Sequence, residues 1–146
     1  MSPRAVRYAQ FVGAAVIAHI VLGLGVPLFA RVKYRHESVA ESFAEILRYF
    51  EPFWQAFEVL PFVLLGVVCG SLPQRARAVG LFVIALLAFS AIYYFGYTRS
   101  EAYMLRRSWT AAILAGAFIP MKCLGVVLVA FLARLVLGRI HVSANA

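Results

Sequence analysis

The sequence contains no aspartate and only two cysteines among its 146 residues. Cys69 and Cys123 stand in different apolar stretches and form no Cys-x-x-Cys pair, which argues against a thiol oxidoreductase. They are typical of small apolar residues that fill a core. A cluster of metal ligands, a P-loop and a dinucleotide-binding glycine motif are also absent. These absences argue against metal-dependent, nucleotide-dependent and disulfide-forming functions.

Apolar residues make up 64% of the chain, whereas soluble domains have about 45–50%. Four apolar stretches lie at residues 8–30, 53–71, 78–97 and 109–133, and each approaches the roughly 20 residues that cross about 30 Å of hydrocarbon. The first stretch is longer than the apolar core of a signal peptide, about 7–15 residues, and no clear cleavage site follows it. The sequence predicts an all-α membrane protein: a single domain, residues 1–146, folded as a four-transmembrane-helix bundle.

The formal net charge is +8, which in a soluble protein would suggest a nucleic-acid partner. Here the basic residues flank the apolar stretches, so we expect membrane lipids and no nucleic acid as partners. Lysine and arginine residues are almost evenly divided between the two membrane faces of the predicted bundle. The positive-inside rule therefore leaves the orientation of the bundle in the membrane open. All six acidic residues are glutamates, and all lie toward residues 31–58 and 98–108. We expect chemistry or binding on that side.

The connection between the first two apolar stretches has the pattern of a helix. In "SVAESFAEILRYF", apolar residues recur at helical spacing, which predicts an amphipathic helix. Ser38 lies three residues before Glu41, the spacing of a capping box, and favours a helix start at Ser38. Pro52 disfavours helical geometry at Glu51 and suits the first turn of the following helix.

A few polar residues interrupt the apolar stretches, and each costs free energy in hydrocarbon. Glu58 and Gln55 are three residues apart and share one helix face, while Tyr93 and Tyr97 share another at a spacing of four. Tyrosines near a membrane surface also suit a simple aromatic belt. We expect Glu58 and Lys122 to face the protein interior.

His19 and Lys122 lie near the middle of the first and fourth apolar stretches. Together with Glu58 they suggest a relay for protons or ions. The alternative, which we favour, is a neutral histidine and a lysine that face the bundle interior, satisfied by backbone carbonyls or a glutamate.

Two stretches resemble a known family, the membrane-associated proteins in eicosanoid and glutathione metabolism (MAPEG), which includes microsomal glutathione transferases. "EPFWQAFEVLP", residues 51–61, is similar to the start of the family's second helix, and "YYFGYTRSEAYMLRR", residues 93–107, to the end of its third. The resemblance implies a homotrimer that binds glutathione between neighbouring subunits and acts on a lipophilic small molecule. The positions that match glutathione-binding or site-lining residues are Arg31, Arg48, Gln55, Glu58, Tyr93 and Tyr97.

The chain departs from the family pattern where catalysis would need a cation. Glu51 and Pro52 replace an Arg-Ala pair, which reverses a charge where a glutathione carboxylate would bind. Met104 stands where several catalytic members have the arginine that stabilises the thiolate. A free thiol has a pKa of about 8.5 and is mostly protonated at neutral pH, so an adjacent cation matters. Arg106 and Arg107 are the nearest candidates for this catalytic role.

Three functional hypotheses follow. The first is a glutathione-dependent transferase or peroxidase that acts on lipophilic electrophiles. The second is a non-catalytic protein of the same fold that binds a lipid or a partner. The third is a small ion-coupled transporter or an accessory subunit, which depends on His19, Glu58 and Lys122.

Overall fold

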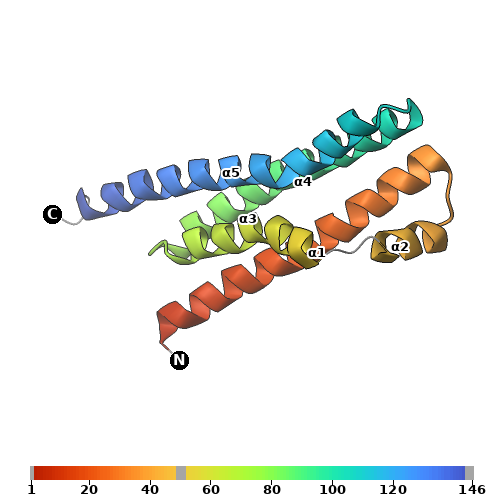
Figure 1. Ribbon diagram of the computed structural model, residues 1–146. Helices are drawn as coiled ribbons and strands as arrows, with labels where there is room; N and C mark the ends of the chain where they lie inside the picture. The colour runs from red at the N-terminus through yellow and green to blue at the C-terminus, as the bar shows by residue number, and fades with distance from the viewer. Residues whose placement is uncertain (1, 49–51, 144–146) are drawn as a thin grey trace.

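The computed structural model describes residues 2–48 and 52–143, and within these residues the fold is entirely helical (Figure 1). The five helices are α1 (Pro3–Arg35), α2 (Val39–Arg48), α3 (Pro52–Gly70), α4 (Arg75–Leu105) and α5 (Trp109–Ser143). No strand occurs in the described part of the chain. The prediction of an all-α protein is confirmed.

Three of these helices are long and apolar enough to cross a membrane: α1, α4 and the part of α5 from Trp109 to Leu137. α3 is also apolar but shorter, with 19 residues. At 1.5 Å per residue it is about 28 Å long, close to the roughly 30 Å of a hydrocarbon core. Helices long enough to span therefore match the first, third and fourth predicted stretches, while the second is occupied by this shorter helix.

The helices run side by side, with α1 packed along α3 and α4 packed along α5. Contacts between α1 and α4 and between α3 and α5 join the two pairs. In Figure 1 the first turn of α1, the last turns of α5 and the turn at residues 71–74 lie at one end of the molecule. The opposite end carries α2 and the connection at residues 106–108, and we name it the charged end.

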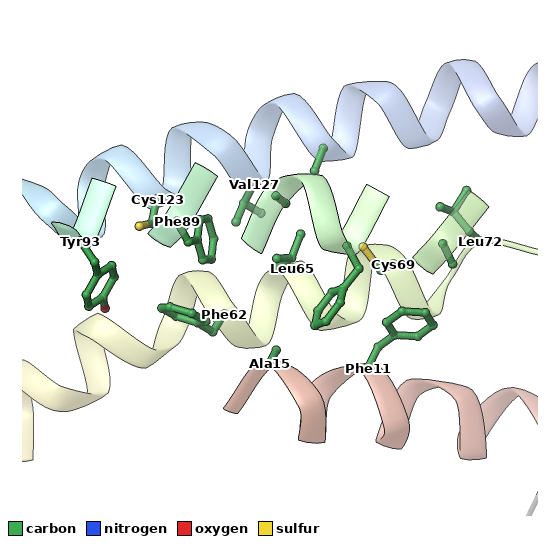
Figure 2. Packing of buried hydrophobic residues seen from close by; sticks show 14 of the residues in the cluster. Phe11, Ala15, Phe62, Leu65, Cys69, Leu72, Phe89, Tyr93, Cys123 and Val127 are labelled. Atoms are coloured by element: carbon green, nitrogen blue, oxygen red, sulfur yellow. The ribbon is translucent and has the colours of Figure 1, made fainter. Parts of the chain in front are cut away.

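Buried aromatic and aliphatic side chains fill the space between the helices. Figure 2 shows them as a row from Tyr93 to Leu72, with Phe62 and Leu65 of α3 near its centre. The Phe62 ring lies edge-on to Phe89 of α4, with ring centroids 4.7 Å apart. Edge-to-face aromatic pairs of this kind contribute about 0.5–1.5 kcal/mol beyond their burial.

Both cysteines belong to this core. Cys69 and Cys123 are buried and free, and Figure 2 shows them at separate points of the row. Their prediction as small apolar fillers is confirmed.

α1 and α3 are in close backbone contact at Gly66. A Cβ atom at this position would lie 2.7 Å from the Cα of Val12 and 2.9 Å from its backbone nitrogen. Because backbone atoms cannot move aside as a flexible side chain can, glycine is the residue that allows this contact.

α2 begins with the predicted capping box. The Ser38 hydroxyl accepts a hydrogen bond from the Glu41 backbone N–H at 3.3 Å, and the Glu41 carboxylate accepts from the Ser38 backbone N–H at 3.0 Å. Hydrogen bonds from Ser38 lower the pKa of the Glu41 carboxyl from its ordinary 4.5. The ionised carboxylate therefore stabilises α2 fully at pH values above the ordinary pKa of 4.5. This contribution is lost as the pH falls through the lowered pKa of the folded protein. The prediction that Pro52 begins the next helix is also confirmed, while Glu51 lies outside the described residues.

The contact at Gly66 yields a first prediction. Gly66→Ala should lower the free energy of unfolding by about 1–3 kcal/mol, because the added methyl group forces α1 and α3 apart. Gly13→Ala is the matched control, since no atom outside its own helix turn lies within 4 Å of a Cβ at that position. It should be neutral or stabilising by up to about 1 kcal/mol. Unfolding in mixed detergent micelles measures both, and equal stability of the two variants would refute the contact.

Candidate functional site

Glu58 is a carboxylate buried near the start of an apolar helix. Its exposed fraction is 4%, and its Oε1 accepts hydrogen bonds from Trp54 Nε1 at 2.9 Å and from the Tyr97 hydroxyl at 3.4 Å. Trp54 lies one turn earlier on α3, whereas Tyr97 belongs to α4. The expectation that Glu58 faces the protein interior is confirmed, and its interaction with Tyr97 connects the two helices.

Tyr93 lies beside Tyr97. We call Glu58, Trp54, Tyr93 and Tyr97 the Glu58 centre. The Tyr93 ring lies 5.9 Å from Tyr97 and 5.8 Å from Phe62, centroid to centroid. The side chain is fully buried, and its hydroxyl has no hydrogen-bond partner among the described residues. In Figure 2 this hydroxyl is turned toward α3. An aromatic belt at the membrane surface does not describe a tyrosine in this position, so that alternative is wrong for Tyr93.

A cluster of ion pairs lies next to this centre, at the charged end. Glu101 accepts two hydrogen bonds from Arg35, from Nε at 2.7 Å and from Nη2 at 3.2 Å. Arg31 pairs with Glu45 of α2 at 2.5 Å and lies 3.9 Å from Glu101. Arg35 also lies 3.6 Å from Glu37 and from Glu45. These five residues, which we call the arginine–glutamate cluster, attach α2 and α4 to the C-terminal part of α1.

Residues 93, 97 and 101 follow one another at intervals of four along α4. This spacing places the two tyrosines and Glu101 on one face of the helix. The Glu58 centre and the arginine–glutamate cluster are therefore neighbours along a single inward face, about one helical turn apart.

The structure brings three of the predicted binding residues together: Glu58, Tyr93 and Tyr97. Arg31 lies in the adjacent cluster, where its guanidinium is paired with Glu45. Gln55 is half-buried on α3, three residues before Glu58.

The other predicted residues stand apart from this centre. Arg48 is exposed at the last residue of α2. Arg106 and Arg107 are exposed in the connection after α4, where Arg107 has a positive φ of 58°. Arg106 is nine residues beyond Tyr97, a separation of about 13 Å along a helix. Within one chain, neither candidate catalytic arginine is placed against Glu58.

His19 and Lys122 occupy different environments. His19 is buried, with its ring 5.1 Å from Phe62 and its Nδ1 without a hydrogen-bond partner among the described residues. Lys122 is exposed on the outer side of α5, while the next residue, Cys123, is buried. The expectation that Lys122 faces the interior is wrong for this chain. Lys122 therefore lies outside the core that contains His19 and Glu58.

Sequence reasoning missed Arg35, Glu45 and Trp54 as members of the site. The i to i+4 spacing of Trp54 and Glu58 was a usable signal for one hydrogen bond. The pairing of Arg35 with Glu101 joins residues 66 positions apart, and nothing local in the sequence indicates it. Both basic and acidic residues are concentrated at residues 31–58 and 98–108. This pattern indicated where the arginine–glutamate cluster lies but not which residues form its ion pairs.

Comparison with protein-family models, with curated proteins and with solved structures found no match to this chain. The resemblance to the MAPEG family therefore stays a prediction from the two quoted stretches.

The arginine–glutamate cluster yields a second prediction. Arg35→Met should lower the free energy of unfolding by about 2 kcal/mol, because Glu101 loses both of its charge-assisted hydrogen bonds. Lys33→Met is the matched control, since Lys33 is exposed and forms no ion pair among the described residues, where its ammonium group lies over the rings of Phe29 and Tyr34. Combining Arg35→Met with Glu101→Gln should cost less than the sum of the two single changes. Additive costs in a double-mutant cycle would show that the pair contributes nothing.

Proposed function

We propose that this chain is a four-span integral membrane protein that binds a small polar ligand at its charged end, beside Glu58. α1, α3, α4 and α5 would be the four spans. The observation that carries the proposal is the burial of the Glu58 carboxylate between Trp54 and Tyr97. A charged side chain within a membrane helix costs free energy, up to roughly 2.5–3.5 kcal/mol at the helix centre on insertion scales, and residues of this kind commonly mark a site.

The unpaired hydroxyl of Tyr93 supports a binding role. A buried polar group without a partner costs about 1–3 kcal/mol. A ligand or an ordered water molecule that reaches this hydroxyl would recover part of that cost. Phe62 packs against the Tyr93 ring and offers no hydrogen-bond partner.

Glutathione is the ligand that the family resemblance implies. Glu58 would accept hydrogen bonds from its ammonium group, and Arg48 and Gln55 would bind its carboxylates. The family's sites lie between subunits, so exposure of Arg48 in a single chain is compatible with a homotrimer, which forms part of this proposal. Arg31 is committed to Glu45 and cannot serve as a free carboxylate-binding cation without breaking that pair.

Binding without thiol activation is the form of the proposal that the geometry supports best. No described cation free of an ion pair lies beside Glu58 and Tyr97, and a thiolate needs such a neighbour. Catalysis is a second candidate because Arg106 and Arg107 are exposed at the charged end. From there they could reach a ligand held by a neighbouring subunit, as a transferase or peroxidase acting on lipophilic electrophiles would require.

The four-span topology predicts that both chain ends face one side of the membrane. Single cysteines introduced as Ser2→Cys and Asn145→Cys should react with an impermeant thiol reagent from the same side. Ser108→Cys, in the connection at the charged end, should react only from the other side. The background would carry Cys69→Ala and Cys123→Ala. Labelling of residues 2 and 145 from opposite sides would exclude an even number of crossings.

The ligand is tested by titrating purified protein with glutathione and following its unfolding temperature. A ligand that binds only the folded state raises apparent stability. Glu58→Gln should weaken binding by about tenfold or more, since it removes the charge that attracts the ammonium group. Glu41→Gln, the same substitution at an exposed capping residue, should leave the affinity unchanged.

The same preparation separates binding from catalysis. S-methylglutathione, which has no ionisable thiol, should bind as well as glutathione if the protein does not activate the thiol. Turnover of a generic electrophile that is lost in Arg106→Ala or Arg107→Ala would instead establish the catalytic candidate. Absence of any saturable glutathione binding would remove glutathione from the proposal.

A further inference from the structure

The outer surface between α4 and α5 carries a lysine at mid-span. Lys122 is exposed and lies 13 residues after Trp109 and 15 residues before Leu137, the limits of the apolar part of α5. At 1.5 Å per residue it is about 20 Å from each limit, near the middle of a bilayer. An ammonium group at that depth is costly unless an anion accompanies it or its stem carries it toward the surface.

Two grooves meet at this lysine. The larger, of about 540 Å³, extends toward the charged end and is lined by Lys122, Arg99 and Tyr103 among apolar residues. The second, of about 420 Å³, is lined by Lys122, and its other described lining residues are apolar, among them Ile84, Ala88 and Val129. One groove therefore holds two cations and a phenol, and the other offers an apolar surface that continues from the same lysine.

The residues that α4 contributes to the larger groove face away from the core. Phe95, Arg99 and Tyr103 follow at intervals of four and are all exposed. They are offset by two residues, or about 200°, from the inward face that carries Tyr97 and Glu101. The groove is thus separate from the Glu58 centre and lies on the opposite side of the same helix.

Among the described residues, no carboxylate lines this groove. Neither lining set contains an acidic residue. Glu58 is buried and hydrogen-bonded, and Glu101 is buried among arginines. The sequence has no acidic residue after Glu101. The described residues of a second copy would therefore bring no exposed mid-span carboxylate to Lys122.

We propose that the α4–α5 groove binds an anionic amphiphile. Its carboxylate or phosphate group would lie in the larger groove with Lys122 and Arg99, and its hydrocarbon chain would occupy the apolar groove beside Ile84 and Val129. Arginine binds such groups through paired N–H donors, and lysine acts as a compact point charge. This arrangement supplies the missing counter-charge and covers the apolar surface with material that a membrane contains.

Binding of oleate and of oleyl alcohol to the purified full-length protein tests the charge requirement. Native mass spectrometry and competition with a fluorescent fatty acid in non-ionic detergent give the affinities. Oleate should bind wild type at least about tenfold more tightly than the alcohol. Lys122→Met should abolish this preference, Lys122→Arg should keep it within about threefold, and Arg99→Gln should reduce it. Lys33→Met is the matched control, because it removes the same charge from an exposed position outside the groove.

Lys122→Met introduces an apolar residue at mid-span and should not impair folding. Oleate should raise the unfolding temperature of wild type and of Lys33→Met, but not that of Lys122→Met.

Two phospholipids identify the source of the anion. Displacement of oleate by dioleoylphosphatidylglycerol, but not by dioleoylphosphatidylcholine, supports an anionic phospholipid as the occupant. Retention of oleate against both supports a free carboxylate. Equal binding of oleate and oleyl alcohol would overturn the proposal, as would unchanged oleate affinity in Lys122→Met. An oligomer that shields Lys122 from an amine-reactive reagent, in protein stripped of lipid, would show a subunit interface instead and would also overturn it.

Discussion

The hydrogen bond that Glu58 accepts from Tyr97 connects α3 to α4, while the bond from Trp54 holds the carboxylate within α3. A carboxylate in an apolar interior must be satisfied by donors from the protein, since hydrocarbon provides none. Tyr97 can reach Glu58 only when α3 and α4 have one particular register. That register also brings Tyr93 beside Phe62 and points residue 101 toward the end of α1. The polar centre and the aromatic core are therefore two consequences of the same alignment.

The arginine–glutamate cluster completes this alignment from the other side. Glu101 is one turn beyond Tyr97 on α4, and Arg35 binds it through two hydrogen bonds from the last residue of α1. Gly66 allows α1 to lie directly against α3. α1 is thus held at one point by close backbone packing and at another by charge. A ligand that entered beside Glu58 would meet a site whose walls are fixed by three helices.

Local signals predicted much of the fold. The lengths of the apolar stretches indicated the helices, the Ser38–Glu41 spacing located the start of α2, and Pro52 marked the start of α3. Each depends on residues within a few positions of one another. The shared face of Tyr93 and Tyr97 was also correct, because helical periodicity fixes it. Pairing between distant segments was not predictable, since Arg35 and Glu101 could each have met several opposite charges at the charged end. The predicted inward direction of the Lys122 side chain was wrong. A charged residue is costly in hydrocarbon and was expected to face the core, yet the neighbouring Cys123 is the residue that fills the core.

Glu58 and Lys122 show two different solutions to charge in an apolar protein. Glu58 is enclosed and satisfied by neutral donors of its own chain, so its environment is fixed by folding. Lys122 is exposed beside two grooves, one of which contains Arg99, and no described carboxylate lines either groove, so no described side chain compensates its charge. α4 separates the two, with Tyr97 on one face and Arg99 on the other. Because both faces belong to one helix, occupation of the outer groove would press on the element that carries the Tyr97 hydroxyl. A coupling between the two proposed sites would therefore act through the position of α4 and through the distance between Tyr97 and Glu58.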